Sequence, residues 1–212
     1  MTTKKRPYRM KRRAELEAAT RLRITQSAVS LHGSVGPAQT SIAAIAKHAG
    51  VRRATVYRHF PDEHALFSAC AAHWLAANPP PEIAQWAQIA DPGLRLKSAL
   101  LELYAYYRRT ERMFYNILRD EDTVPVLKQL LTPYRRFLAA AGEVLRAGRN
   151  LSPPAEREVK AVIGHALCFH TWRSLAIDQG CDDAEIVRLL CLWVQSVGTH
   201  SRQSEPSPFA AK

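Results

Sequence analysis

The sequence lacks the features that mark secreted, membrane-spanning and metal-binding proteins. Its four cysteines at 70, 168, 181 and 191 form no CxxC pair and have no histidine at zinc-site spacing. No uncharged apolar run approaches the roughly 20 residues of a membrane-spanning helix. The segment after the N-terminal basic residues carries charges where a signal peptide would be apolar. We therefore expect a cytoplasmic protein with reduced thiols, no metal and no cofactor.

Catalytic motifs are also missing. The chain has no glycine-rich phosphate loop, no nucleophile elbow and no HExxH sequence. His165 and Cys168 have helical spacing but would supply only two metal ligands. No catalytic residue is predicted. An enzyme whose catalytic residues are scattered along the chain is an alternative, which a turnover assay would detect.

Acidic residues are scarce in the first sixty positions. Residues 1–60 hold 13 of the 30 Lys and Arg but only two of the 19 Asp and Glu, so the remainder holds 17 of each sign. The whole net charge of +11 therefore lies in residues 1–60. Such asymmetry indicates a segment that binds a polyanion, either nucleic acid or an anionic membrane. The membrane alternative is less favoured because the segment has no helix with cations on one face and bulky apolar residues on the other.

Helical spacing dominates the chain, and no alternating pattern predicts a strand. We expect residues 1–13 to be a flexible basic arm and a first helix to run from about 14 to 32. Two glycines and a proline in 33–37 end that helix. Thr40 is the predicted N-cap of a second, short helix.

A glycine turn then joins two short helices. Gly50 suits the position after a helix where the backbone adopts the left-handed conformation, and Val51 can pack between the two helices. Val56 and Phe60 lie on one side of the next helix, and Asp62 can cap a fourth helix that extends to about residue 77. The sequence therefore predicts a helix-turn-helix over about 41–60, whose second helix enters the major groove of DNA.

The outward side of this second short helix carries the basic and hydrogen-bonding residues. Arginine can bond guanine O6 and N7 together, and a threonine methyl can contact a thymine methyl. Residues near the N-terminus of such a helix reach base edges, and later residues meet the sugar-phosphate backbone. The predicted DNA-binding residues are Arg52, Arg53 and Thr55 toward bases, and Tyr57, Arg58 and His59 toward the backbone.

Prolines mark a boundary after the fourth helix. We expect a linker over 78–92, a helical domain over 93–200 and a disordered tail over 201–212. The expected helices of this domain run from about 93 to 110, 111 to 119, 123 to 148, 154 to 179 and 183 to 199. The fold class is therefore all-α with about nine helices: a three-helix DNA-binding head and a larger helical domain for ligand binding and dimerisation.

The last two expected helices are apolar over more than one face, which predicts burial on two sides. Two such helices from each of two subunits could form a four-helix interface. The alternative is the core of a monomer. The predicted interface residues are Val162, Ile163, Ala166, Ile186, Leu189, Leu190, Trp193 and Val197.

A group of aromatic and polar side chains in the same domain could line a ligand pocket, since such pockets combine apolar walls with a few hydrogen-bonding groups. Plain core packing is the alternative for each of them. The candidates are Tyr104, Tyr107, Phe114, Tyr115, His165, Phe169 and Trp172.

Residues 40–67, TSIAAIAKHAGVRRATVYRHFPDEHALF, resemble the helix-turn-helix region of the tetracycline-repressor (TetR) family of bacterial regulators. The resemblance covers about 14–75, and the expected DNA-binding domain covers 14–77. It implies a homodimer that binds a palindromic operator, usually as a repressor, and a helical body that senses a small-molecule effector. It also implies that Thr40 bonds a phosphate.

One position departs from this family pattern. Glu63 stands where the family commonly has a phosphate-binding lysine at the start of the fourth helix. A glutamate there favours the helix dipole but repels DNA. We expect the basic arm, Lys4 to Arg13, to compensate along the backbone or in the minor groove. A non-specific or architectural DNA-binding protein that relies on this arm is the alternative function; its affinity would fall steeply with salt and favour no sequence.

Overall fold

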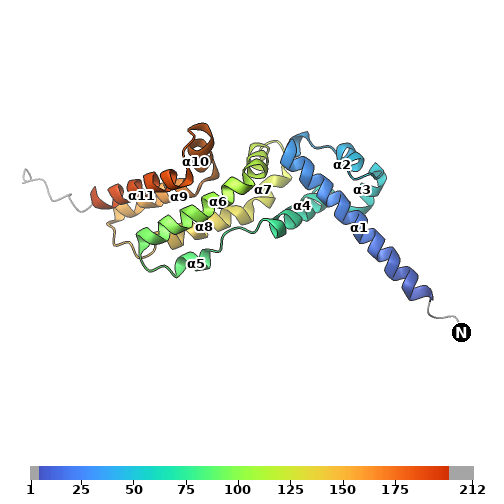
Figure 1. The fold of residues 1–212 in the computed structure, drawn as a ribbon, viewed down its shortest axis with the longest axis horizontal. Helices are drawn as coiled ribbons and strands as arrows, with labels where there is room; N and C mark the ends of the chain where they lie inside the picture. The colour runs from blue at the N-terminus through green and yellow to red at the C-terminus, as the bar shows by residue number, and fades with distance from the viewer. Residues whose placement is uncertain (1–4, 201–212) are drawn as a thin grey trace, which may run out of the picture. The chain divides into compact units, whose positions relative to one another are not determined.

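The computed structural model describes residues 5–200, and within that range the chain forms helices and no strand (Figure 1). The predicted all-α fold class is confirmed. The described residues contain eleven α-helices, a short 3-10 helix η1 and a π-helical segment η2, where the sequence predicted about nine helices. The expected tail, 201–212, and the first four residues of the expected arm lie outside the described residues.

The chain divides into two compact units. The first unit comprises the residues up to Pro79 together with Arg112–Leu131, and the second comprises Pro80–Glu111 and the residues from Thr132 onward. Helix α6 (Pro92–Arg119) contributes its last part to the first unit and its earlier part to the second. The predicted boundary at 78–92 did not foresee that residues 112–131 would group with the N-terminal helices.

The first unit is built around α1 (Lys5–Ser34). Against it pack α2 (Ile42–His48) and α4 (Glu63–Ala77), while α3 (Arg53–His59) packs against α2 (Figure 1). The apolar residues of these four helices meet in one core, as their spacing predicts. Its buried members are Ile24, Ala28, Ile45, Ala46, Ala49, Val56, Phe60, Leu66 and Cys70. Helix α7 (Val126–Leu130) packs against α4, where Leu127 contacts Phe67.

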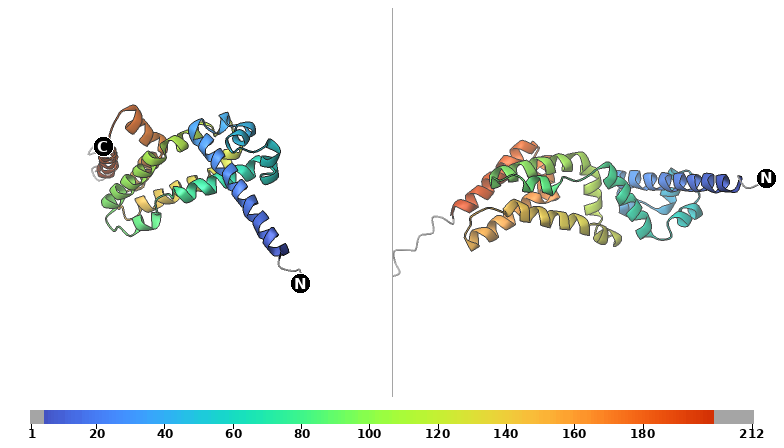
Figure 2. Two further views of the ribbon diagram at one scale, coloured as in Figure 1. Left: turned by 45° about the vertical axis from the view of Figure 1, so that its right-hand side comes forward. Right: turned by 90° about the horizontal axis from the view of Figure 1, so that it is seen from below.

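The start of α1 differs from the flexible arm that the sequence predicted. Residues 5–13 form the first turns of α1, and both views of Figure 2 show these turns extending beyond α2, α3 and α4. Lysine, arginine and methionine have good helix propensity, and Pro7 falls in the first turn, where a missing N–H costs little. The basic residues therefore continue the helix.

The second unit contains α5 (Ile83–Ala87), α8 (Thr132–Arg146), α9 (Pro153–Leu167), α10 (Phe169–Arg173), η2 (Ser174–Asp178) and α11 (Asp183–His200). Helix α9 packs against both α8 and α11. Two helices differ from the expected ones. Helix α6 is continuous past residue 110, and the single helix expected over about 123 to 148 is divided before Thr132, with Pro133 in the first turn of α8. The expected linker holds α5 because Trp86 is buried and its Nε1 donates to Glu102 Oε2 at 2.6 Å.

A buried arginine holds the second unit together. The guanidinium of Arg95 donates to four main-chain carbonyls, those of Ile89, Ala90, Val144 and Ala147, at 2.7 to 3.1 Å. Replacing Arg95 with methionine keeps the apolar stem but leaves these acceptors without their donor. We expect the free energy of unfolding to fall by about 3 kcal/mol, measured by urea denaturation. The exposed Lys97→Met is the control, and an equal midpoint for the two variants would contradict the prediction.

A buried histidine makes the stability of the first unit depend on pH. His32 stacks on Phe67 with ring centroids 4.7 Å apart. Burial lowers the pKa of His32 to about 4, although the charge of Asp120 opposes this shift. Below the unfolded-state pKa of about 6.5, the unfolded chain binds a proton that the folded chain does not, so stability falls as the pH falls toward 4.

We therefore expect the parent to lose about 2 kcal/mol of unfolding free energy between about pH 7 and about pH 5 through His32. His32→Phe removes the titrating group, keeps the stacking and should flatten that slope in denaturant titrations at the two pH values. The exposed His64→Phe should leave the slope unchanged. A slope that persists in His32→Phe would assign it to other groups.

Candidate nucleic-acid interface

The first short helix of the predicted helix-turn-helix begins one residue later than the sequence suggested. Ser41, and not Thr40, is the N-cap of α2, since Ser41 Oγ accepts from Ala44 N at 3.1 Å. Thr40 Oγ1 instead donates to the carbonyl of Gly36 at 2.7 Å. Two hydroxyl residues are adjacent here, and the first of them, Thr40, is the C-cap of η1 (Pro37–Gln39). The predicted N-cap was therefore wrong by one position.

The turn between α2 and α3 has the expected geometry. Gly50 is left-handed, with φ 64°, and Val51 N donates to Ala46 O at 2.9 Å. Val51 packs against the core, and Val56 and Phe60 are buried in it. Asp62 Oδ1 accepts from Ala65 N at 2.7 Å and caps α4. The local signals in the sequence therefore predicted this turn and both of its neighbouring helices.

The outer side of α3 exposes most of the residues predicted to bind DNA. Arg52 is the N-cap, and Arg53 opens the helix; both are exposed, as is Arg58. Among the residues that the structure describes, none pairs with these three guanidinium groups. Thr55 is half-buried and Tyr57 is 50% exposed. The outer side therefore carries positive charge that no carboxylate of its own unit neutralises within the described residues.

His59 lies apart from this outer side. Its side chain is only 8% exposed, and its Nε2 is buried with no hydrogen-bond partner in the described part of the chain. The sequence placed His59 toward the DNA backbone; the structure turns it inward because it is the last residue of α3, beside the buried Phe60. His59 is therefore not one of the exposed residues on the outer side of α3.

Arg21 of α1 is a residue that the sequence did not single out. Its Nη1 donates to the carbonyl of His59, and its Cζ lies 4.1 Å from the centroid of the Phe60 ring. This cation–π contact and hydrogen bond fasten the end of α3 to α1. The two hydrogen-bond partners are 38 positions apart in the chain, so no local pattern indicates the contact.

The same segment is matched by a known family. A family model described as "Bacterial regulatory proteins, tetR family" matches residues 24–70, which span the last third of α1, the helix-turn-helix and the first half of α4. This segment of the chain is therefore that of a TetR-family DNA-binding regulator, and the exposed arginines of α3 are suited to bind DNA. None of the curated proteins compared with the chain matches it.

Solved structures share the fold over most of the chain. A protein from Clostridium perfringens has a TM-score of 0.60 at 12% identity and covers 82% of this chain and 97% of its own. NalD, the secondary repressor of the MexAB-OprM multidrug efflux pump in Pseudomonas aeruginosa, has a TM-score of 0.56 at 22% identity, with 86% and 97% covered. A TetR transcription regulator from Haloarcula marismortui has a TM-score of 0.53 at 15% identity, with 87% and 98% covered. At these identities the likeness shows the fold.

Four of the seven residues predicted to line a pocket pack against one another in the second unit: Tyr104, Tyr107, Phe169 and Trp172. Phe114 and Tyr115 belong to the first unit, where Phe114 packs edge-on against Trp74, and the other five belong to the second. Tyr104, Tyr107, Phe169 and Trp172 are buried in the second unit, while His165 is exposed.

The tyrosine hydroxyls in this group bind the main chain. Helix α9 ends because Cys168 is extended, with φ −71° and ψ 131°. Tyr104 Oη donates to Ala166 O at 2.7 Å, and Tyr107 Oη donates to Leu167 O at 2.8 Å. Burial raises the pKa of both tyrosines, so they stay protonated donors. These two tyrosine hydroxyls therefore satisfy carbonyls at the end of α9.

The residues predicted to form a dimer interface fall into two groups. Five are buried within a single second unit and hold its own helices together: Val162, Ile163, Ala166, Ile186 and Leu190. Val197 is half-buried. Leu189 and Trp193 are 44% and 47% exposed on α11, next to Leu192 at 51%. The Trp193 ring lies 5.9 Å from that of His165 on α9. These exposed side chains form an apolar surface on α11.

The described residues show neither a metal cluster nor a membrane-spanning segment. Among them, no group of three or more His, Cys, Asp and Glu could hold a metal ion. All four cysteines are free, and burial raises the pKa of Cys70 to about 12. Within residues 5–200, no helix is long and apolar enough to cross a membrane.

Proposed function

We propose that this TetR-family regulator is a homodimeric repressor that binds a palindromic operator through α3 and is released from it by a small-molecule effector. The observation that carries the proposal is the outer side of α3, where Arg52, Arg53 and Arg58 are exposed and unpaired within the described residues. A planar guanidinium at the start of a recognition helix can bond a guanine edge, and Tyr57 can bond the backbone beyond it.

Two heads are needed for a palindrome. The apolar surface formed by Leu189, Leu192 and Trp193 gives α11 a side that a second copy could cover, with α9 beside it. A two-fold pair of such surfaces would be self-complementary, as homodimers require. An effector releases the DNA only if it binds the DNA-free arrangement more tightly than the DNA-bound one. The repressor role is supported by the family and by relatives such as NalD, a repressor.

The test is selection of bound duplexes from a random and genomic pool at about 150 mM salt, where non-specific phosphate contacts are weakened. Enrichment of an inverted repeat bound at least about a thousandfold tighter than scrambled duplex is the expected result. If no duplex is enriched and binding only fades with salt, the protein coats DNA without sequence preference, and the proposal is wrong.

The basic start of α1 is proposed to add phosphate contacts. Lys11, Arg12 and Arg13 are exposed and have no ion-pair partner among the described residues. We expect a chain that starts at residue 14 to bind the selected duplex more weakly, with a salt slope smaller by about 0.9 for each phosphate that it no longer neutralises. Titrations at several salt concentrations measure both quantities. Unchanged affinity and slope would show that the basic turns do not touch DNA.

A further inference from the structure

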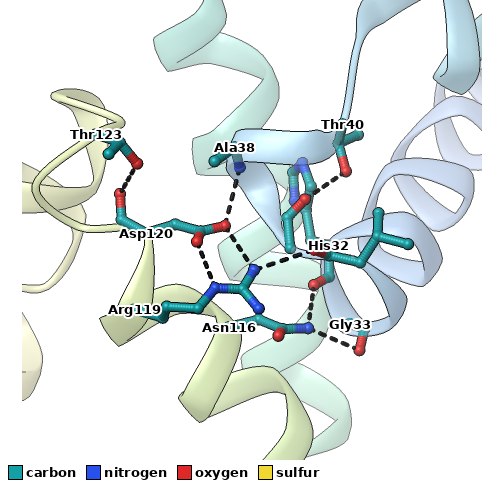
Figure 3. Close-up of polar contacts among 10 residues, drawn as sticks. His32, Gly33, Ala38, Thr40, Asn116, Arg119, Asp120 and Thr123 are labelled. Atoms are coloured by element: carbon teal, nitrogen blue, oxygen red, sulfur yellow. Dashed lines mark hydrogen bonds and ion pairs between the residues drawn. The ribbon is translucent and has the colours of Figure 1, made fainter.

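The end of α1 is held by side chains that lie about 80 residues later in the chain. We call this contact the clasp: Arg112, Asn116 and Arg119 of α6 with Asp120 directly after it. Figure 3 shows Asn116, Arg119 and Asp120. Three side chains of the clasp donate to the last carbonyls of α1 and the residue after it. The bonds run from Arg112 Nη2 to Ser34 O (2.9 Å), from Asn116 Nδ2 to His32 O and Gly33 O (3.0 Å each), and from Arg119 Nη2 to Val35 O (3.0 Å).

Asp120 extends the clasp to η1. Its Oδ2 accepts from Ala38 N at 3.0 Å, and its carboxylate is held by Arg119 through Nε at 2.7 Å and Nη2 at 3.1 Å (Figure 3). Gly36 makes this approach possible: its φ is 95°, and a Cβ there would collide with Arg119 Nη2 and Asp120 Oδ2. Asp120 is buried, so its carboxylate is committed to these contacts.

The segment that the clasp holds leads directly into the helix-turn-helix. Ala38 lies in the middle of η1, Thr40 follows and bonds back to Gly36, and Ser41 caps α2. The turn at Gly50 joins α2 directly to α3. The clasp therefore fixes where α2 starts relative to α1, and with it the direction of α3 within the first unit.

We infer that Asp120 and Arg119 are positioning residues for operator binding, which set the placement of α2 and α3 within one head without touching DNA. This inference rests on the proposed function. It concerns the affinity of each single head for its half-site, and so it differs from a change in the spacing of two heads. Loss of the clasp weakens recognition even when only one half-site is present.

For Asp120→Asn, the inference and simple electrostatics predict changes in DNA affinity of opposite sign. Asp120→Asn removes a negative charge, and by electrostatics alone such a change strengthens binding to DNA. The inference predicts the opposite, a loss of about tenfold in affinity for the selected duplex and for a single half-site, because Arg119 loses its ionic partner. Binding to scrambled duplex is expected to stay the same.

Asp122→Asn is the matched control for this charge change. It removes the same charge two positions away from Asp120. Asp122 is exposed, and its carboxylate lies 3.2 Å from Lys128 Nζ, so it takes no part in the clasp. By electrostatics alone, this variant should bind the selected duplex as well as the parent or slightly better.

A second variant keeps the test independent of folding. Arg119→Lys retains the charge but cannot form the two-pronged contact with Asp120, and Arg119 is partly exposed, so the fold should tolerate it. We expect the same direction of change, together with faster amide hydrogen exchange of Ala38 and unchanged exchange in α7. Circular dichroism melts exclude variants that are unfolded at the assay temperature.

Each outcome decides the question. Weaker binding by Asp120→Asn and Arg119→Lys, with Asp122→Asn at or above the parent, supports the inference. Affinity equal to or above the parent in both clasp variants overturns it while the proposed function stands. A loss seen only with the full inverted repeat also overturns it, because the clasp would then act on head spacing. A parent that selects no duplex overturns both.

Discussion

Replacing Arg53 with alanine is expected to weaken selective DNA binding strongly and leave the fold intact. Arg53 is exposed at the start of α3 and contributes nothing to the core, so its loss should not change the melting temperature. A two-pronged contact with guanine is worth about 1 to 3 kcal/mol per site, and a palindrome contains it twice. The expected loss for the selected duplex is therefore roughly 30-fold to 20,000-fold. Fluorescence anisotropy with the selected and scrambled duplexes measures it.

A control substitution distinguishes base recognition by Arg53 from a general effect of its positive charge. Arg136→Ala removes one positive charge from an exposed site on α8, in the second unit, and should change both duplexes little. Tyr57→Ala should weaken binding to all duplexes alike, because its predicted partner is the backbone. If Arg53→Ala and Arg136→Ala reduce the affinity for the selected and the scrambled duplexes by equal factors, Arg53 supplies charge and contacts no base specifically.

The helix-turn-helix could be predicted from the sequence because its signals are local. A left-handed glycine, a capping aspartate and apolar residues at helical spacing act within a few positions of one another, and Gly50, Asp62 and Val56 behave as expected. The error at Thr40 is of the same local kind. Two adjacent hydroxyl residues compete for the N-cap, and the preceding η1 decides between them.

The contacts that the sequence did not predict join distant positions. No residue near Cys168 predicts the break after α9. This break leaves main-chain carbonyls at the end of the helix that accept hydrogen bonds from the hydroxyls of Tyr104 and Tyr107. Aromatic residues with polar groups suit a pocket and a helix end equally well, so composition alone could not distinguish them. The clasp between Asp120 and Ala38 spans 82 positions and depends on the space that Gly36 leaves.

The apolar surface on α11 leads to the second large effect. Leu189→Asp is expected to convert the proposed dimer to a monomer, since a charge buried against a second copy without a partner is costly. Leu189 is exposed in the single chain, so the variant should fold with an unchanged melt at low protein concentration. In a dimer, binding of one head raises the effective concentration of the other head at the second half-site, and a monomer lacks this effect. Affinity for the inverted repeat should fall by about 10²- to 10⁴-fold, while affinity for one half-site stays the same.

Leu94→Asp is the matched control for this dimer prediction. Leu94 lies on α6 in the same unit and is 59% exposed, so its substitution introduces the same charge on an equally open surface. Sedimentation velocity at micromolar concentration should show a dimer for the parent and Leu94→Asp and a monomer for Leu189→Asp. A dimer that survives Leu189→Asp but not Leu94→Asp would place the interface on α6. In that case the exposed Leu192 and Trp193 would need another explanation, because the contact between the Trp193 and His165 rings covers only part of that surface.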